Sequence, residues 1–573
     1  MKRPDITTPQ ALFGASARYK APVFQRLYVW GKNELLGLGE DIETADPTIG
    51  QFLGAIVLKD LGRPGGPTSP TTYLLIDGQQ RLTTLYLLLL NLAKIAYTHG
   101  DLPSAEFIWQ NYLVETKSPQ FRGWPKLVPT LQDRHTFYEI LELALPDYQW
   151  DTSADPEDKR PRPARKLVDQ WDRLSTYLEE ATGVTTGALD QNSFNNILTT
   201  VQEHLKLIDI TLEAQDDANA IFSRLNAKGV PLELADLVRN EVFSKFGPSE
   251  SGKADKFYLK NWQPFEKSIP DGSISAFFPV YAYIALHGKV TKAAAFAALQ
   301  KAWKTKAPSA VLADLQRYSP YFSALTEYSE LDGLSKALNA QVERMSRMPR
   351  SRVTWPFIIQ ALRAVEQGLL SEAYALRSLR IVESFLVRRA LVGREPTGLH
   401  AVFKTLWDKT KGAPTDVRKS IVTRTILSPS NDELTAFLTK ERSDSRVVLD
   451  YIMEEYERSI IKANKYDPPP QTVATVEHVL PQNLTSEWSK LFSVDQHEKF
   501  VGLLGNLVPL SEMQNKSVQD QSWALKRKRF AGSNFKTTQE IAKLGSWSPT
   551  EITKRTKKLV TWIIETWPEL GTI

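Results

Sequence analysis

The residues best suited to chemistry lie near the C-terminus, where Glu477 and His478 follow one another at the end of a β-rich run, 473–476. A histidine can act as the general base that activates water, and a carboxylate is a ligand for a hard divalent cation. Further along, Asn506 can hydrogen-bond the imidazole and fix its tautomer, and Asn515 offers a second ligand oxygen. Together these groups meet the needs of phosphodiester hydrolysis, which requires an activated water and a cation at the developing charge.

The elements that must position these side chains can be predicted from the same stretch of sequence. The β-rich run predicts a strand, and a second apolar run, 507–510, follows a Gly-Asn turn. Ser511 and Gln514 have capping-box spacing, which predicts that a helix begins at about Glu512. The order is therefore strand, loop, strand, helix, with the polar groups at the junctions. His497, which lies in a polar stretch between the two strands, is expected on a helix surface.

A second candidate site lies near the N-terminus, in the segment 76–84, Ile-Asp-Gly-Gln-Gln-Arg-Leu-Thr-Thr. It follows a strand pattern and opens a helix, so backbone N–H groups and the positive end of the helix dipole converge on one point, which suits a phosphate. Arg81 adds a planar fork for phosphate oxygens, and Asp77 can hold a metal or a water. The segment 22–30 supplies a second Gln-Arg pair and aromatic residues such as Tyr28 and Trp30, which could stack on an altered base or belong to the core.

The rest of the chain divides by pattern into an α/β part and a helical part. Short β-rich runs at 55–58 and 73–76, joined by a Gly- and Pro-rich loop, predict a hairpin, and 206–212 predicts another strand. Helical periodicity dominates 250–455, and a Pro-rich connector, 462–471, leads into the last part. The two candidate sites are therefore expected at the two ends of the chain, separated by helices.

Composition narrows the chemistry and the surroundings. The 573 residues include no cysteine, which excludes disulfides and cysteine-bound zinc and favours a hard ion such as Mg²⁺ or Mn²⁺. The net charge is only +5, but basic clusters at 526–529 and 554–558 suit a polyanion such as DNA, or are solvated helix faces. The most apolar stretch, 82–97, is too short for a bilayer, and no signal-peptide pattern is visible, so we expect a cytoplasmic protein with no membrane partner.

The C-terminal pattern resembles a known nuclease domain. Its Glu-His-x-x-Pro-Gln, its Leu-Gly-Asn-Leu-x-x-Leu and the Asn that follows are similar to the HNH (His-Me finger, ββα-metal) domain that ends the GmrSD-type modification-dependent (type IV) restriction endonucleases. The stretch 519–521 departs from this pattern, because a second Asn is expected in the helix. The resemblance implies that His478 matches the general base, Asn506 the middle residue, Glu477 and Asn515 the metal ligands, and Lys526 a trailing basic residue that could contact phosphate.

Three ordered blocks resemble the ParB-like domain that forms the N-terminal part of the same enzymes. They are Gln-Arg-x-Tyr-x-Trp, Asp-Gly-Gln-Gln-Arg-x-Thr-Thr and Phe-x-x-Leu-Asn-x-x-Gly-x-x-Leu, although Leu27 stands where the family has proline. The resemblance implies binding and hydrolysis of a nucleoside triphosphate such as GTP or ATP, with Asp77, Gln80 and Arg81 foremost. The residues that it assigns to nucleotide binding are Gln25, Arg26, Asp77, Gly78, Gln79, Gln80, Arg81, Thr83, Thr84 and Asn226.

These observations combine into one expectation for fold and function. The fold is α+β and mostly helical, with a ParB-like α/β domain at 1–245, a helical domain at 246–460 and an HNH nuclease domain at 461–573. The resemblance, which extends to the SspE and BrxU proteins, implies a nucleotide-regulated endonuclease of host anti-phage defence that cuts modified phage DNA; a homodimer is left open. Two alternatives also stay open: a nucleotide-driven nickase of a phosphorothioate-linked defence system, and a DNA-binding defence module without catalysis.

Overall fold

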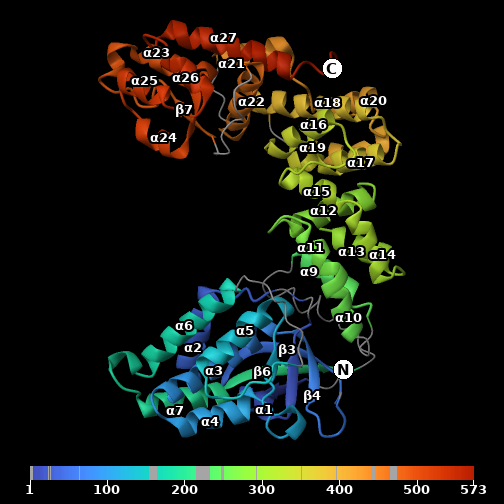
Figure 1. Ribbon diagram of the computed structural model, residues 1–573, viewed down its shortest axis with the longest axis vertical. Helices are drawn as coiled ribbons and strands as arrows, with labels where there is room; N and C mark the ends of the chain where they lie inside the picture. The colour runs from blue at the N-terminus through green and yellow to red at the C-terminus, as the bar shows by residue number, and fades with distance from the viewer. Residues whose placement is uncertain are drawn as a thin grey trace. The chain divides into compact units, whose positions relative to one another are not determined.

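The computed structural model describes residues 4–22, 25, 27–63, 65–153, 164–213, 233–246, 251–291, 293–349, 351–394, 397–440, 446–464 and 474–573. The chain forms two compact units, one of Met1–Pro264 with Lys306–Val311 and the other of Phe265–Thr305 with Leu312–Ile573 (Figure 1). The predicted domain boundaries at 245 and 460 stay predictions; helix α22 (Arg446–Asn464) runs across the second of them within one unit. No helix in the described ranges is long and apolar enough to cross a membrane.

A six-stranded sheet organises the first unit, and its elements are β1 (Asp5–Thr7), β2 (Ala17–Lys20), β3 (Gln51–Asp60), β4 (Thr71–Asp77), β5 (Leu127–Val128) and β6 (Leu205–Leu212). The strand order is β1-β6-β3-β4-β2-β5. Strands β3 and β4 pair antiparallel, which confirms the predicted hairpin. Strand β6 lies parallel to β3, which confirms the third predicted strand.

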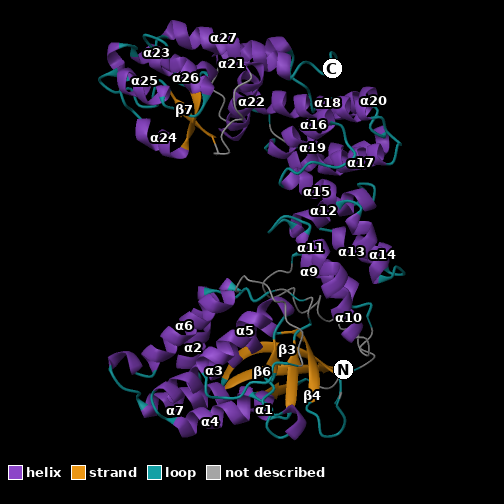
Figure 2. Cartoon of the chain, in the orientation of Figure 1, coloured by secondary structure: helices purple, strands orange, loops and turns teal. Residues whose placement is uncertain are grey.

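Helix α3 (Gln79–Thr98) is the central helix of this unit, and it begins within the segment 76–84, which the sequence predicts to open a helix. Its residues 85–90, Leu-Tyr-Leu-Leu-Leu-Leu, are all at most 1% exposed, so the helix is apolar on every side and is covered on every side. Figure 2 shows the helices and the strands of this unit. The other helices are α1 (Pro9–Gly14), α2 (Lys32–Glu43), α4 (Leu102–Ile108), α5 (Leu131–Ala144), α6 (Arg165–Ala181), α7 (Gln191–Thr199), α9 (Leu234–Phe243) and α10 (Ser251–Phe257).

The second unit is helical over most of its length. Two helices, α11 (Gln263–Lys267) and α14 (Pro308–Gln316), have residues in both units. The other helices of the second unit up to α22 are α12 (Ile274–Ala285), α13 (Ala295–Trp303), α15 (Ser319–Thr326), α16 (Lys336–Arg347), α17 (Trp355–Glu366), α18 (Glu372–Leu391), α19 (Leu399–Thr410), α20 (Pro414–Ile421) and α21 (Asn431–Lys440). The described residues between α11 and the end of α22 form no strand, which confirms the helical prediction. The Ser371 hydroxyl caps the long helix α18 by accepting from the Tyr374 N–H.

A two-stranded hairpin and five helices complete the second unit: β7 (Ala474–His478), α23 (Val494–Phe500), β8 (Leu507–Ser511), α24 (Glu512–Val518), α25 (Trp523–Ala531), α26 (Lys536–Ala542) and α27 (Pro549–Thr566). Strands β7 and β8 pair antiparallel, and α24 follows directly, so the predicted strand, loop, strand, helix order is confirmed. The Ser511 hydroxyl accepts from the Gln514 N–H at 3.3 Å, which also confirms the predicted cap. The fold is therefore mixed α and β and mostly helical.

Candidate functional site

Strand β7 and helix α24 bring two of the predicted residues to one face of the C-terminal hairpin. Alternate residues of a strand point to the same side, so Thr475 and Glu477 of β7 share a face. The Asn515 Nδ2 donates to the Thr475 hydroxyl at 2.9 Å, which places Asn515 against that face. Because the amide nitrogen is turned to Thr475, the amide oxygen of Asn515 is the atom left over as a possible metal ligand. Glu477 thus lies on one face of β7, Asn515 of α24 lies against that face, and His478 ends the strand.

Lys526 lies beneath this strand end and not on the surface. Its side chain is fully buried, its Nζ lies 2.8 Å from Glu477 Oε1, and it donates to the His478 carbonyl at 2.7 Å. In this structure the ammonium is held by two protein oxygens and has no exposed surface, so the predicted phosphate contact stays a prediction that the geometry does not favour. Burial raises the pKa of Glu477 and lowers the pKa of Lys526, and the attraction between the two charges opposes both shifts. Lys526 instead braces the backbone and the carboxylate that flank the candidate base.

Asn506 is buried, and its side chain is used completely by the protein. Its Oδ1 accepts from the Leu480 N–H at 2.7 Å and from the Trp547 Nε1 at 3.1 Å. Its Nδ2 donates to the carbonyls of Leu480 and Val501, both at 2.9 Å. A side-chain amide has two donor hydrogens and two acceptor lone pairs, so none is left for the imidazole of His478. The predicted bond to the imidazole is therefore wrong, and Asn506 fixes the loop that follows the histidine.

Two further residues have roles that the sequence did not predict. His497 is buried, and its Nε2 lies 2.8 Å from the Pro481 carbonyl in the same loop, so the expectation of a surface histidine is wrong. A Cβ on Gly505 would lie 2.3 Å from the Ile552 carbonyl and 2.3 Å from the Thr556 hydroxyl. Helix α27 therefore packs directly on the turn before β8, and the Gly of the Leu-Gly-Asn motif is the available signal for this close approach.

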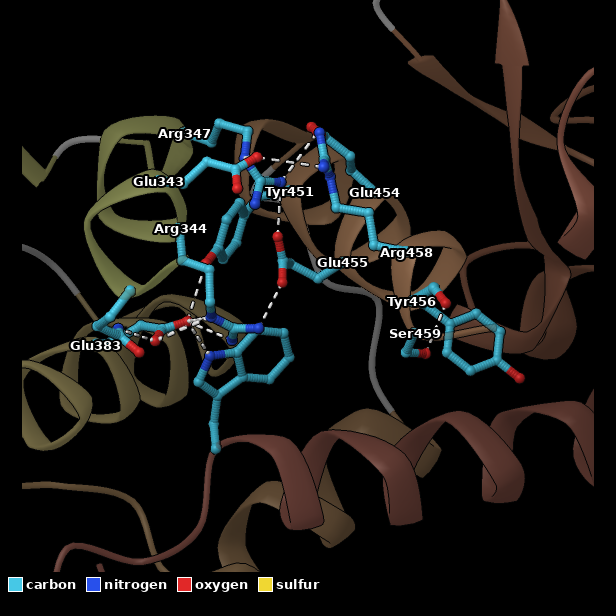
Figure 3. Close-up of polar contacts among 12 residues, drawn as sticks. Glu343, Arg344, Arg347, Glu383, Tyr451, Glu454, Glu455, Tyr456, Arg458 and Ser459 are labelled. Atoms are coloured by element: carbon cyan, nitrogen blue, oxygen red, sulfur yellow. Dashed lines mark hydrogen bonds and ion pairs between the residues drawn. The ribbon is translucent and has the colours of Figure 1, made fainter. Parts of the chain in front are cut away.

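A cluster of charged residues ties helix α22, which precedes β7 in the chain, to α16 and α18 (Figure 3). The Arg344 guanidinium lies 2.6 Å from the Glu383 carboxylate and 2.5 Å from the Glu455 carboxylate of α22. The Trp567 indole, just after α27, donates to Glu383 Oε1 at 2.7 Å. Further along α22, the buried Glu457 accepts backbone N–H groups at the start of α26 at 2.6 and 2.9 Å. The hairpin is thus built onto the helical part through α22 and α27.

In the first unit, side chains of the Asp-Gly-Gln-Gln-Arg block hold the backbone of the segment 27–30. The Gln80 Oε1 accepts from the Val29 N–H at 2.8 Å, and the Gln80 Nε2 donates to the Leu27 carbonyl at 3.3 Å. The Thr84 and Tyr28 hydroxyls lie 2.6 Å apart, and Asp133 of α5 accepts the Tyr28 N–H at 2.8 Å. Burial raises the pKa of Asp133 to about 6. These polar groups therefore fix the shape of the segment.

The predicted nucleotide-binding residues thus separate into buried and accessible ones. Near the end of β4, the Leu75 and Ile76 carbonyls accept hydrogen bonds from the Gln25 side-chain amide at 3.3 and 3.0 Å. Thr84 has no exposed surface, so its assignment to nucleotide binding stays a prediction that its burial does not favour. Tyr28 belongs to the core and does not offer a stacking face. Arg26 and Asn226 lie outside the described residues. The buried members of the set are Gln79, Gln80, Thr83 and Thr84.

Asp77, Gly78 and Arg81 occupy the junction of β4 and α3. Gly78 caps the helix with a φ of 88°, which favours glycine, and a Cβ there would lie 2.7 Å from the Ile56 side chain. The Arg81 Nη1 donates to the Ala55 carbonyl at 2.6 Å. Within the described part of the chain, no other group forms a hydrogen bond or an ion pair with the side chain of Arg81 or Asp77. A helix start, a carboxylate and most of a guanidinium therefore stay available for a ligand.

Two family models match the chain: GmrSD restriction endonuclease, N-terminal domain, over 10–243, and GmrSD restriction endonucleases, C-terminal domain, over 428–562. The chain belongs to the GmrSD restriction endonuclease family. The GmrSD domains indicate a DNA endonuclease in defence, with DNA as its substrate. The N-terminal match contains the β4–α3 junction and the C-terminal match contains the hairpin, so both candidate sites lie inside matched domains. No curated protein in the comparison matches the chain.

Proposed function

We propose that this GmrSD-family chain cuts DNA at the C-terminal hairpin, with His478 as the general base. The observation that carries the proposal is the contact of Asn515 with β7, the strand that ends in Glu477 and His478. His478 is neither fully buried nor fully exposed, so water can reach it. It takes a proton from the water that attacks phosphorus while the bond from phosphorus to the sugar oxygen breaks. Lys526 keeps the strand end in place during this step.

Glu477 and Asn515 would hold Mg²⁺ or Mn²⁺. Carboxylate and amide oxygens are the hard donors that these ions prefer, and the Asn515 amide oxygen is the one not directed to Thr475. Among the residues that the structure describes, no group of three or more His, Asp or Glu side chains gathers, so one carboxylate and one amide would be completed by water and phosphate oxygens. When bound, the ion would stabilise charge on the phosphate and on the leaving oxygen.

The β4–α3 junction is the proposed nucleotide site. The helix start of α3 presents backbone N–H groups, and its dipole favours an anion. Arg81 has N–H groups to spare for phosphate oxygens, and Asp77 can hold a metal ion or a water beside them. A nucleoside triphosphate such as GTP or ATP supplies the charge that this junction suits, and its binding would regulate cutting.

Cutting must be gated by a part of the chain other than the hairpin. A small nuclease centre contacts mainly phosphates, which position a strand but carry no sequence information. Such a centre would cut host DNA if nothing restrained it. We therefore infer that the first unit supplies the restraint, by responding to a modified base on phage DNA and to a nucleotide.

The test is cleavage of phage genomic DNA that contains plain or hypermodified cytosine, at one salt concentration, with and without GTP, ATP and Mg²⁺. We expect faster cutting of the modified DNA, a response to a nucleotide, and no cutting in excess chelator until Mg²⁺ or Mn²⁺ is added. Equal cutting of both DNAs with no nucleotide response would leave only a non-specific nuclease. Full activity in chelator would refute the metal site.

A further inference from the structure

Strand β3 is irregular where it passes Arg81. Its pairing with β6 shifts between Phe52 and Gly54, so the strand bulges there. Gly54 has a φ of 114°, which L side chains rarely adopt. A Cβ on Gly54 would lie 3.0 Å from the Arg81 Nε and 3.1 Å from its Cζ, which is tighter than an ordinary contact. The guanidinium therefore lies directly against the glycine, in space that any side chain would fill.

The guanidinium is only partly used by the protein. A guanidinium has five N–H donors in a fixed fork, and the bond from Nη1 to the Ala55 carbonyl at 2.6 Å takes one of them. Over the described ranges Arg81 forms no ion pair, although its side chain is half-buried. A partly desolvated charge without an opposite charge is costly, and an anionic ligand would relieve that cost.

We propose that Gly54 is a positioning residue for nucleotide binding: by lacking a side chain, it lets β3 hold the Arg81 fork in the orientation that takes phosphate oxygens. This inference rests on the proposed nucleotide site at the β4–α3 junction. The Ala55 carbonyl fixes one edge of the fork, and Gly54 makes room for the rest of it. A larger residue at position 54 pushes the guanidinium off this carbonyl and misaligns its free N–H groups.

The experiment compares Gly54→Ala with Gly62→Ala in the full chain. Gly62 also has a positive φ, 72°, but a Cβ there would meet no heavy atom within 4 Å, so the control carries backbone strain without touching Arg81. The measurement is the dissociation constant for GTP and for ATP, each with Mg²⁺. Gly54→Ala should weaken binding roughly tenfold or more, since a charge-assisted hydrogen bond is at stake, and Gly62→Ala should leave it unchanged.

A double variant separates positioning from general damage. In an Arg81→Ala background, Gly54→Ala should cause no further loss of nucleotide affinity, because the residue that it displaces is gone. Its effect on the unfolding temperature should persist in both backgrounds. A glycine with a merely structural role would weaken binding equally in both.

The outcomes distinguish this inference from the function on which it rests. If the unaltered protein binds neither nucleotide, the nucleotide site and the role of Gly54 are overturned together. If it binds and Gly54→Ala binds equally well, only the role of Gly54 is overturned. If Gly54→Ala does not fold, Arg81→Lys decides, because lysine keeps the charge and loses the fork. A loss of affinity with lysine supports the positioned fork, and full affinity overturns it.

Discussion

Each of the two candidate sites joins a strand end to a helix, yet their polar side chains are used in different ways. At the β4–α3 junction the uncharged members, such as Gln80 and Thr84, are committed to internal bonds, while Asp77 and Arg81 keep most of their capacity. At the C-terminal hairpin the uncharged Asn506 is committed too, but so is a charged residue, Lys526. A sequence motif therefore contains both residues that can bind a ligand and residues that keep the site in shape. The type of a residue alone does not show to which group it belongs.

The carboxylates of Asp133, which is buried, and Glu477, which is mostly buried, show the same contrast in electrostatic terms. Glu477 has the Lys526 ammonium 2.8 Å away, which offsets part of the cost of burial. Asp133 is held by neutral donors, the Thr130 hydroxyl and the Tyr28 N–H, both at 2.8 Å. Neutral donors offset burial less than a cation does, so charge at Asp133 is costly. The energetic cost of burying Asp133 therefore depends on whether it is protonated, whereas Glu477 is stabilised by its ion pair with Lys526.

The largest effect on DNA cleavage is expected at His478, the residue proposed to act in the reaction. His478→Ala should lower the rate of DNA cleavage by about 10²–10⁴-fold, because a general base contributes about that much, while the unfolding temperature stays close to that of the parent. His99→Ala, at an exposed position in the first unit, is the control and should cut normally. Cleavage at the parent rate by a well-folded His478→Ala protein would remove the proposed base.

Lys526 is expected to matter for stability. Lys526→Met leaves the Glu477 carboxylate buried without its cation, and breaking one partner of a buried pair costs about 3–5 kcal/mol of unfolding free energy. Adding Glu477→Gln should restore part of the loss, because the uncompensated charge is then gone. Denaturant unfolding of the two single variants and the double variant measures the coupling. A cost below about 1 kcal/mol for Lys526→Met would place the pair in the class of weak surface bridges.

Local patterns predicted the elements of both sites, and distant packing decided the roles. The hairpin, the cap at Ser511 and the start of α3 follow from alternation, turn residues and helix signals within a few positions. Asn506 and His497 could not be placed in this way. The first is bound by Trp547 and the second by Pro481, and these contacts exist only once the helices and the loop after β7 have packed.

The Asp133 carboxylate should make the stability of the protein depend on pH. Its folded-state pKa of about 6 lies above the ordinary 3.8, so the folded chain holds the Asp133 proton more tightly than the unfolded chain does. This contribution is fully present below about pH 4 and is lost as the pH rises through 6, by on the order of 2–3 kcal/mol. Asp133→Asn should flatten the profile between these values, as measured by unfolding at each pH.

The control for Asp133 is Glu142→Gln, an exposed position of the same helix α5, which removes a surface charge only and should leave the profile as it is. If the profile of Asp133→Asn keeps its slope from pH 4 to 6, another group carries the dependence. The contrast with Glu477 would then need a different explanation.

The smallest effect is expected from DNA contacts on α25, where Lys526 and Lys528 stand two residues apart. Lys528 is exposed, whereas Lys526 is fully buried, although both belong to one basic cluster in the sequence. Each lysine that pairs with a phosphate releases counterions, so the logarithm of the binding constant falls with the logarithm of salt concentration by about 0.9 per contact. Lys528→Ala should make this slope shallower by about that amount, equally for plain and modified DNA.

Lys526→Met, studied where it stays folded, should leave the slope unchanged despite the same loss of one formal charge. The measurement is the affinity for one duplex across a salt series, for the parent and for both variants. Because the two substitutions remove equal charge from neighbouring positions, net charge cannot explain a difference between them; only access to phosphate can. If both variants have a slope shallower than that of the parent by the same amount, Lys526 also contacts DNA. Its ion pair with Glu477 must then break when the substrate binds.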